Sequence, residues 1–211
     1  MLKLKSILVA LFISGSLLAQ DEFQGVITYA LSYDLSAEMK PYESMLPKTS
    51  QMMYRDKISK TTMETAATGG STMVITDNEK KQVLTLMDNG MQKIAIRNSF
   101  EDEESEQPDY NTTGEKKEIV GYKCEVMEAE VEGSVVRICI TKDLPSIHTE
   151  NTGGLEGFPL EVEIETEQMT TRQTVSKIVE GNVPKLKLEV PSGYEEMTLE
   201  EYQKSLMPVG Q

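Results

Sequence analysis

Tryptophan is absent from this chain of 211 residues, and histidine occurs only once, at His148. A zinc site needs several nitrogen or sulfur ligands, which one histidine and two cysteines that can pair with each other do not supply. The sequence also lacks a G-x-S-x-G nucleophile elbow, a glycine-rich phosphate loop and a metalloprotease helix. We therefore expect a protein that is not an enzyme and that holds no metal and no cofactor.

Basic residues are also scarce. The chain has 21 Lys and Arg against 35 Asp and Glu, which gives a formal net charge of −14. Removal of residues 1–19 takes away two lysines and no acids, so 19 bases against 35 acids leave −16. A chain this acidic repels nucleic acid and anionic membrane surfaces at long range. We expect no nucleic-acid partner.

Only one long apolar run is present, and it lies at the N-terminus, in MLKLKSILVALFISGSLLAQ. Lys3 and Lys5 precede the run and Ala19 follows it, which is the pattern of a cleavable secretory signal. The run is too short to span a bilayer comfortably, and no cysteine follows it to carry a lipid anchor. We predict a signal peptide over residues 1–19, a single domain over residues 20–211, no membrane-spanning segment and a periplasmic or secreted location.

The two cysteines are Cys124 and Cys139, and an exported chain is one in which disulfides persist. The sequence around them predicts two strands joined by a turn near residues 130–133. With a four-residue loop, Ala129 pairs with Ser134 and Cys124 faces Cys139, so that a disulfide can form and stabilise the fold by about 3 kcal/mol. A shorter loop shifts the register by two residues and places the cysteines diagonally. Two separate buried thiols are the alternative.

Apolar and polar residues alternate along most of the mature chain, which is typical of half-buried antiparallel strands. The pattern runs through residues 26–33, 84–96, 136–140, 160–179 and 186–190, and residues 48–76 predict three shorter strands. The Asp88-Asn89-Gly90 sequence predicts a hairpin turn. Helical signals are limited to residues 36–46 and 198–206, the latter with Thr198 and Glu201 at capping-box spacing. We predict a mainly β fold, in which a curved antiparallel sheet forms a half-barrel with one or two short helices.

Acidic residues concentrate in two places. Five lie in residues 101–106, within an acidic loop predicted over residues 98–115 that we interpret as solvated, because it lacks the alternating Asp spacing of a calcium loop. In the stretch FPLEVEIE, Glu161, Glu163 and Glu165 share one side of a strand. Carboxylates two residues apart lie about 6.6–7 Å apart, too far to hold one ion unaided. We interpret them as a solvent-facing row that Arg172 or Lys177 can neutralise.

Methionine, by contrast, is abundant, with 13 residues. Its soft, unbranched side chain adapts to apolar ligands of varied shape, although it also fills irregular cores. A curved sheet with small helices does not fill its own concavity easily, which favours a ligand cavity. The candidate lining residues are the apolar positions of two predicted strands: Leu160, Val162, Ile164, Val136, Ile138 and Ile140.

Several short motifs follow one another along the chain: FQGVITY (23–29), GYKC (121–124), TKDL (141–144), GFPL (157–160) and VPSGY (190–194). In this order they resemble an uncharacterised domain family (type 4412) of exported Bacteroidota proteins, over about residues 23–202. That family is similar in architecture to the periplasmic lipoprotein carriers of the LolA/LolB type. The resemblance implies a half-barrel with helices at its mouth, in which the carriers receive acyl chains, and it implies no catalytic residues.

Two functions follow as hypotheses. The first is a periplasmic or secreted binding protein that shields an apolar ligand, a lipid or a lipoprotein acyl chain, in the concave face of the sheet. The alternative is a non-enzymatic envelope protein that binds another envelope protein and fills its own core without a ligand. The volume enclosed by the sheet distinguishes them, because ligand sites generally exceed about 300 Å³.

Overall fold

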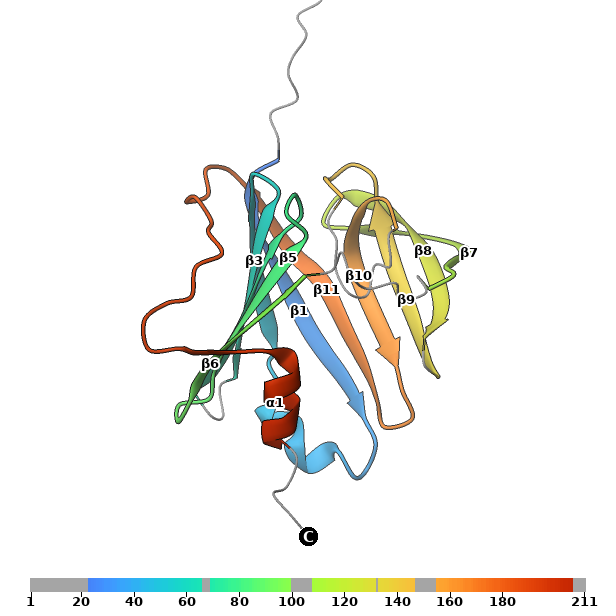
Figure 1. Cartoon of the computed structure of the whole chain (residues 1–211). Helices are drawn as coiled ribbons and strands as arrows, with labels where there is room; N and C mark the ends of the chain where they lie inside the picture. Colours follow the sequence, from blue (N-terminus) through green and yellow to red (C-terminus); the bar gives the residue numbers. More distant parts are fainter. Residues whose placement is uncertain (1–22, 66–68, 100–107, 132, 147–154, 207–211) are drawn as a thin grey trace, which may run out of the picture.

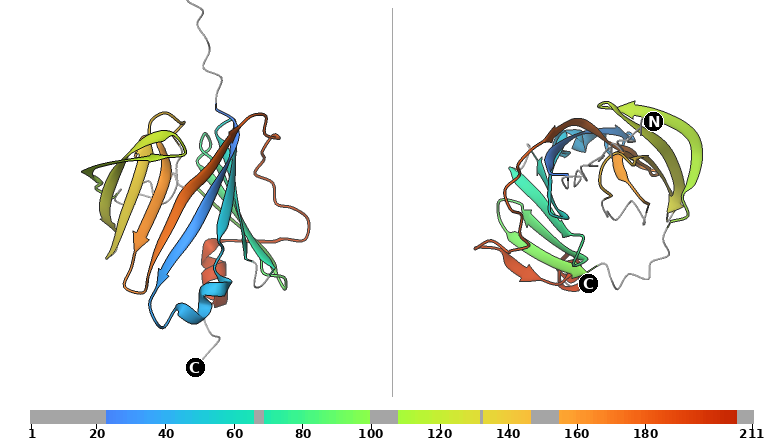
Figure 2. Two further views of the ribbon diagram at one scale, coloured as in Figure 1. Left: turned by 180° about the vertical axis from the view of Figure 1, so that it is seen from behind. Right: turned by 90° about the horizontal axis from the view of Figure 1, so that it is seen from above.

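The fold is a single twelve-stranded sheet, which a computed structural model describes over residues 23–65, 69–99, 108–131, 133–146 and 155–206. The strands lie in the order β12-β6-β5-β4-β3-β2-β1-β11-β10-β9-β8-β7 (Figure 1). Neighbouring strands are antiparallel, except for β12, which runs parallel to β6. The sheet bends into an open half-barrel, seen end-on in the right-hand view of Figure 2. The predicted mainly β half-barrel is confirmed.

The strands and helices have the following bounds: β1 (Gly25–Leu35), η1 (Lys40–Met45), β2 (Thr49–Arg55), β3 (Ile58–Thr65), β4 (Gly70–Asp77), β5 (Gln82–Asp88), β6 (Lys93–Ser99), β7 (Asn111–Ile119), β8 (Tyr122–Val131), β9 (Ser134–Thr141), β10 (Phe158–Glu165), β11 (Met169–Glu180), β12 (Glu195–Met197) and α1 (Leu199–Leu206). The three short strands predicted over residues 48–76 are β2, β3 and β4. The turn at Asp88-Asn89-Gly90 joins β5 to β6, as predicted. Asn89 Oδ1 accepts hydrogen bonds from the backbone amides of Met91 and Gln92.

Residues 181–194, which we call the strap, follow β11 and cross the sheet without joining it. The strap runs along the outer side of the half-barrel over β3–β6 (Figures 1 and 2). Its residues Leu188, Val190 and Tyr194 pack on a buried cluster of Ile75, Leu84, Leu86 and Ala95. The strand predicted over residues 186–190 is therefore wrong. An extended segment lying across a sheet also presents alternate side chains to it, so the two cases share one sequence pattern.

Helices are short and few, as predicted. At α1, the Thr198 hydroxyl accepts a hydrogen bond from the Glu201 amide while the Glu201 carboxylate accepts one from the Thr198 amide, which is the predicted capping box. The segment predicted as a helix over residues 36–46 forms only a 3-10 helix, η1. In a helix over residues 36–46, Pro41 would lie in the interior, where its missing N–H and its ring disrupt the helix; η1 therefore begins at Lys40, with Pro41 in its first turn.

Cys124 and Cys139 form a disulfide, with their Cα atoms 5.3 Å apart. The register of β8 and β9 pairs Val131 with Ser134 and Val126 with Cys139. The prediction of a four-residue loop is therefore wrong, and the strands are joined by the shorter, two-residue loop. The cysteines are diagonal neighbours, which the twist of a two-stranded ribbon can bring within bonding reach.

The acidic loop predicted over residues 98–115 is shorter than expected. β6 continues to Ser99, and β7 begins at Asn111, so residues at both ends of the predicted loop pair in the sheet. The five clustered acids and His148 lie outside the described residues, as does the predicted signal peptide. Among the described residues, no helix has the length and apolar character needed to cross a membrane.

Candidate functional site

Residues paired across antiparallel strands share one face of the sheet, so the register can be followed as rows from strand to strand. One such row crosses the six strands from β1 to β6: Ile27, Met52, Thr61, Val74, Thr85 and Ile96. The neighbouring row on the opposite face is Val26, Met53, Lys60, Ile75, Leu84 and Arg97. Ile75 and Leu84 contact the strap, which lies outside the half-barrel. The first row therefore faces inward.

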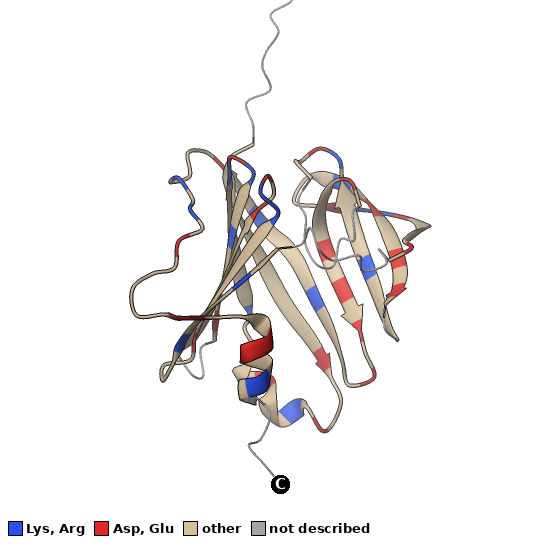
Figure 3. Ribbon diagram, in the orientation of Figure 1, with Lys and Arg blue, Asp and Glu red and all other residues tan. Residues whose placement is uncertain are grey.

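Charge is divided between the two faces. All charged residues of β1–β6, β9 and β10 lie on the outward face, which we call the charged face: Asp34, Arg55, Lys60, Glu64, Asp77, Asp88, Lys93, Arg97, Arg137, Glu161, Glu163 and Glu165. Figure 3 marks these residues along the strands. The inward face of the same strands, which we call the charge-free face, carries aliphatic residues, Met, Ser, Thr, Tyr and Asn. Burying part of this face therefore requires no unpaired charge to leave water.

The candidate lining residues of β9 and β10 lie mostly on the charge-free face. The register joins Leu31, Gln173, Val162 and Ile138 in one row that continues the face across β1, β11, β10 and β9. Val136, Ile138 and Ile140 form a buried cluster there, at 4%, 0% and 8% exposure, with Val162 and Ile164 packed against it. These side chains line the inner face but are already covered.

Leu160 differs from the other five candidates. The register of β10 with β9 shifts between Pro159 and Glu161, so Leu160 is the extra residue of a β-bulge. It is fully buried in a different cluster, which joins Phe158 and Cys139 to Ile27 and Met52 of the charge-free face. A bulge breaks the alternation that the sequence shows, which is why sequence reasoning placed Leu160 with Val162.

An open cleft of about 410 Å³ lies where β4–β6 approach α1. Three of its lining residues, Thr72, Met87 and Ile94, form one row on the charge-free face. Tyr202 of α1 lines its other side. Sequence reasoning did not bring these residues together; the abundance of methionine was the signal that pointed to Met87.

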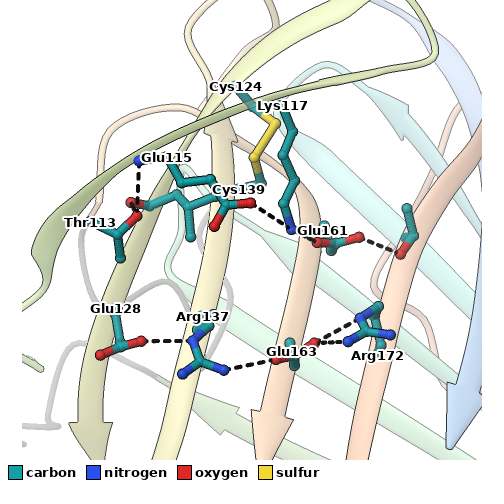
Figure 4. Close-up of polar contacts among 12 residues, drawn as sticks. Thr113, Glu115, Lys117, Cys124, Glu128, Arg137, Cys139, Glu161, Glu163 and Arg172 are labelled. Carbon is teal, nitrogen blue, oxygen red and sulfur yellow. Dashed lines mark hydrogen bonds and ion pairs between the residues drawn. A yellow bond between two sulfur atoms is a disulfide. The ribbon is translucent and has the colours of Figure 1, made fainter.

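The charged face carries a network across β7–β11 (Figure 4). Arg137 donates to Glu128 on one side (Nε to Oε2, 2.7 Å) and to Glu163 on the other (Nη1 to Oε1, 3.1 Å), and Arg172 Nε also donates to Glu163 (2.7 Å). Partial burial acts to raise the pKa of Glu163, but the hydrogen bonds from the two arginines outweigh it and hold that pKa below its ordinary value. The row therefore links four strands, β8 to β11, through ion pairs.

Glu161 is the centre of a second group of polar contacts on the charged face. Lys117 Nζ lies 2.7 Å from Glu161 Oε1, and the Thr174 hydroxyl donates to Glu161 Oε2 at 2.9 Å. The hydrogen bond to Glu161 raises the pKa of Lys117. The Glu161 and Glu163 side chains are each 14% exposed, so the solvent-facing row predicted from sequence is correct only for Glu165, at 53%.

Beside this network lies a shallow polar cleft of about 390 Å³, between Ser32, Asp34, Glu163 and Arg172. The arginine and Glu163 in it are already paired with each other. No group of three or more His, Cys, Asp or Glu residues that could hold a metal ion occurs among the residues described. The geometry of the charged face is that of a structural network.

The architecture defines the class of protein: an open half-barrel, antiparallel except for β12, with a disulfide and with an inner face that carries no charged residue in β1–β6, β9 and β10. The chain matches the family described as a domain of unknown function (DUF4412) over residues 23–152, and it belongs to that family. None of the curated proteins matches it.

Similar solved structures include PNGF-II in two crystal forms. In the P21 form the TM-score is 0.57 at 14% identity, covering 87% of this chain and 33% of that one; in the C2 form it is 0.55 at 12%, covering 86% and 32%. This chain thus spans about a third of PNGF-II, and the likeness is one of fold alone. LprF from Mycobacterium bovis aligns with a TM-score of 0.35 at 9% identity, over 81% of this chain and 90% of that one, a likeness too weak to support an argument.

Proposed function

We propose that this protein is an exported, non-enzymatic binding protein that shelters an apolar ligand, a lipid or a lipoprotein acyl chain, against the charge-free face of its half-barrel. The observation that carries the proposal is the division of charge between the two faces. A sheet in water needs one hydrated face, but solubility alone does not require that all charged residues of β1–β6, β9 and β10 lie on that face. Such a division is useful when the other face takes up an apolar molecule.

The cleft beside α1 gives the ligand an entry point. Its volume of about 410 Å³ falls within the range of small-molecule sites, about 300–1,000 Å³. Met87 and Ile94 contribute apolar surface, beside polar residues that include Asp88 and Gln92, and each methylene of an acyl chain that becomes fully buried contributes about 0.8 kcal/mol. Met87 can adjust its rotamer to chains of different shape.

The Cys124–Cys139 disulfide supports an exported location, since disulfides persist in oxidising compartments and are rare in the cytosol. The predicted signal peptide over residues 1–19 agrees with that location.

A second function is favoured by the burial of Val136, Ile138 and Ile140. The charge-free face is already covered in β9 and β10, and its residues Ile27 of β1 and Met52 of β2 are buried too. If the whole face is covered in this way in solution, the protein is an envelope interaction protein with a self-filled core, and it carries no ligand.

The test compares two neighbouring threonines of β3. Thr61 lies on the charge-free face between Met52 and Val74, and Thr62 lies on the charged face between Gln51 and Met73. Both side chains are partly buried. Thr61→Lys places an ammonium group in the ligand's path, whereas Thr62→Lys adds the same charge to the face that already carries charges.

Binding is measured by displacement of the fluorescent hydrocarbon diphenylhexatriene and by native mass spectrometry of protein purified from its own envelope. We expect the unmodified chain and Thr62→Lys to bind the probe, and Thr61→Lys to bind it at least about tenfold more weakly, since an unpaired charge in an apolar site costs several kcal/mol. If the unmodified chain carries no lipid and binds no probe, the proposed binding function is wrong, and the protein is instead an envelope interaction protein whose core is filled by its own side chains.

A further inference from the structure

Ser50, in β2, is a buried polar residue whose hydroxyl group makes no hydrogen bond that would stabilise the described part of the fold. Its side chain is 3% exposed, and its hydroxyl finds no hydrogen-bond partner among the residues that the structure describes. Buried hydroxyl groups are nearly always paired, because an unpaired one loses its bonds to water without replacement. A group of this kind is therefore a candidate for contact with a bound molecule.

The register connects Ser50 to the cleft beside α1. One row of the charge-free face runs from β1 to β6 through Tyr29, Ser50, Met63, Thr72, Met87 and Ile94. The last three of these line the cleft. Only Met63, which is partly buried, lies between the cleft and Ser50. Adjacent strands are about 4.8 Å apart, so Ser50 lies about 10 Å from Thr72, within reach of a chain that displaces the flexible Met63 side chain.

Tyr29 lies next to Ser50 in this row, on the far side from the cleft. Its side chain is 2% exposed, and its hydroxyl makes a weak 4.0 Å contact to the sulfur of Met52. Burial raises the pKa of Tyr29, so the phenol stays neutral and able to donate. Two residues with neutral hydroxyl groups thus occupy paired positions at the inner end of the row, on a face without charged residues in β1–β6.

We infer that Ser50, assisted by Tyr29, is the polar anchor of the binding site and that it recognises an uncharged hydrogen-bonding group, such as an ester carbonyl or a hydroxyl, on an otherwise apolar ligand. This inference rests on the proposed function and narrows its ligand class. A free carboxylate is disfavoured, because no cation of β1–β6 faces inward to pair with it and burying it unpaired is costly.

The first experiment uses the unmodified protein and three competitors with matched acyl chains: monoolein, oleate and octadecene. Each displaces diphenylhexatriene in a titration at pH 8, where oleate is ionised. We expect monoolein to bind about fivefold or more tightly than octadecene, the gain of a single hydrogen bond. We expect oleate to bind more weakly than monoolein. Equal affinities for monoolein and oleate would overturn the inference.

The second experiment removes the hydroxyl. Ser50→Ala is expected to lower the affinity for monoolein about fivefold, to leave that for octadecene unchanged, and to leave the melting temperature equal or slightly raised, because an unpaired buried hydroxyl is lost. Ser59→Ala is the control. Ser59 is the other buried serine of the charge-free face and lies two rows from Ser50. It should leave the monoolein affinity unchanged.

The outcomes separate the inference from the proposal on which it rests. If the probe binds but Ser50→Ala leaves monoolein affinity unchanged, Ser50 is not an anchor and the binding function stands. If Ser50→Ala lowers the melting temperature by several degrees, its hydroxyl serves the fold and the inference is wrong. If no probe binds the unmodified protein, the proposed function itself fails.

Discussion

Reduction of the Cys124–Cys139 disulfide is the perturbation whose effect can be worked out most directly. The bond joins residues 15 positions apart in the β8–β9 hairpin. In the chain-entropy model, closing a loop of this length restricts the unfolded chain enough to stabilise the native state by about 3 kcal/mol. The native hairpin pairs through its own ladder, so reduction should leave the folded structure in place.

The assay is urea unfolding of the same protein with and without dithiothreitol, followed by circular dichroism. With a denaturant slope of about 2 kcal/mol per molar, a loss of 3 kcal/mol moves the midpoint down by about 1.5 M. In a thermal scan, the same loss lowers the melting temperature by about 6–12 °C for a chain of this size. A matched control is the double variant Cys124→Ala/Cys139→Ala, whose midpoint should not respond to dithiothreitol.

The reasoning would be refuted by a midpoint shift below about 0.5 M on complete reduction. That result would mean that the unfolded chain already keeps residues near the hairpin together, so that the bond removes little freedom. A large drop in the denaturant slope on reduction would instead point to a partly unfolded native state.

Two further predictions concern individual positions. Glu163→Gln should destabilise the fold by about 1 kcal/mol at pH 7, where its carboxylate accepts from Arg137 and Arg172. Because folding lowers the pKa of Glu163 from 4.5, this stability is present above that pH and is lost as the pH falls through the lowered pKa, so the difference between the unfolding curves of the variant and the unmodified protein should shrink as the pH is lowered. Gly157→Ala should destabilise by more than about 2 kcal/mol, since its φ is +129° and an added Cβ would lie 2.5 Å from Ile140 Cγ2; a melting temperature within a degree of the unmodified protein would contradict this.

The elements that the sequence predicted well depend on residues close together in the chain. The capping box of Thr198 and Glu201 and the Asn89-Gly90 turn each act within four residues, and both are present. The alternation of β1 also survived, because a strand with one buried face keeps a period of two along its own length. These local patterns suffice for the class of fold.

The candidate site was predicted less well. Five of the six lining residues lie on the inner face, but the bulge before Glu161 moves Leu160 into another cluster. The cleft that joins Thr72 to Met87 and the unpaired hydroxyl of Ser50 were not predicted. The bulge, the cleft and the burial of Ser50 all depend on which residues of neighbouring strands pair with one another. The sequence pattern of a single strand does not contain that information.

By itself, the amino-acid order determined where strands alternate, where they turn and where the last helix begins, because those choices are made by short-range sterics and by hydrogen bonds between near neighbours. The tertiary structure decided how the strands align. The register gathers the charges of β1–β6, β9 and β10 on one side, lays the strap over Leu84, and leaves Ser50 facing inward. Alignment is set by packing between residues distant in the chain, and so the charge-free face became visible only when the strands were placed side by side.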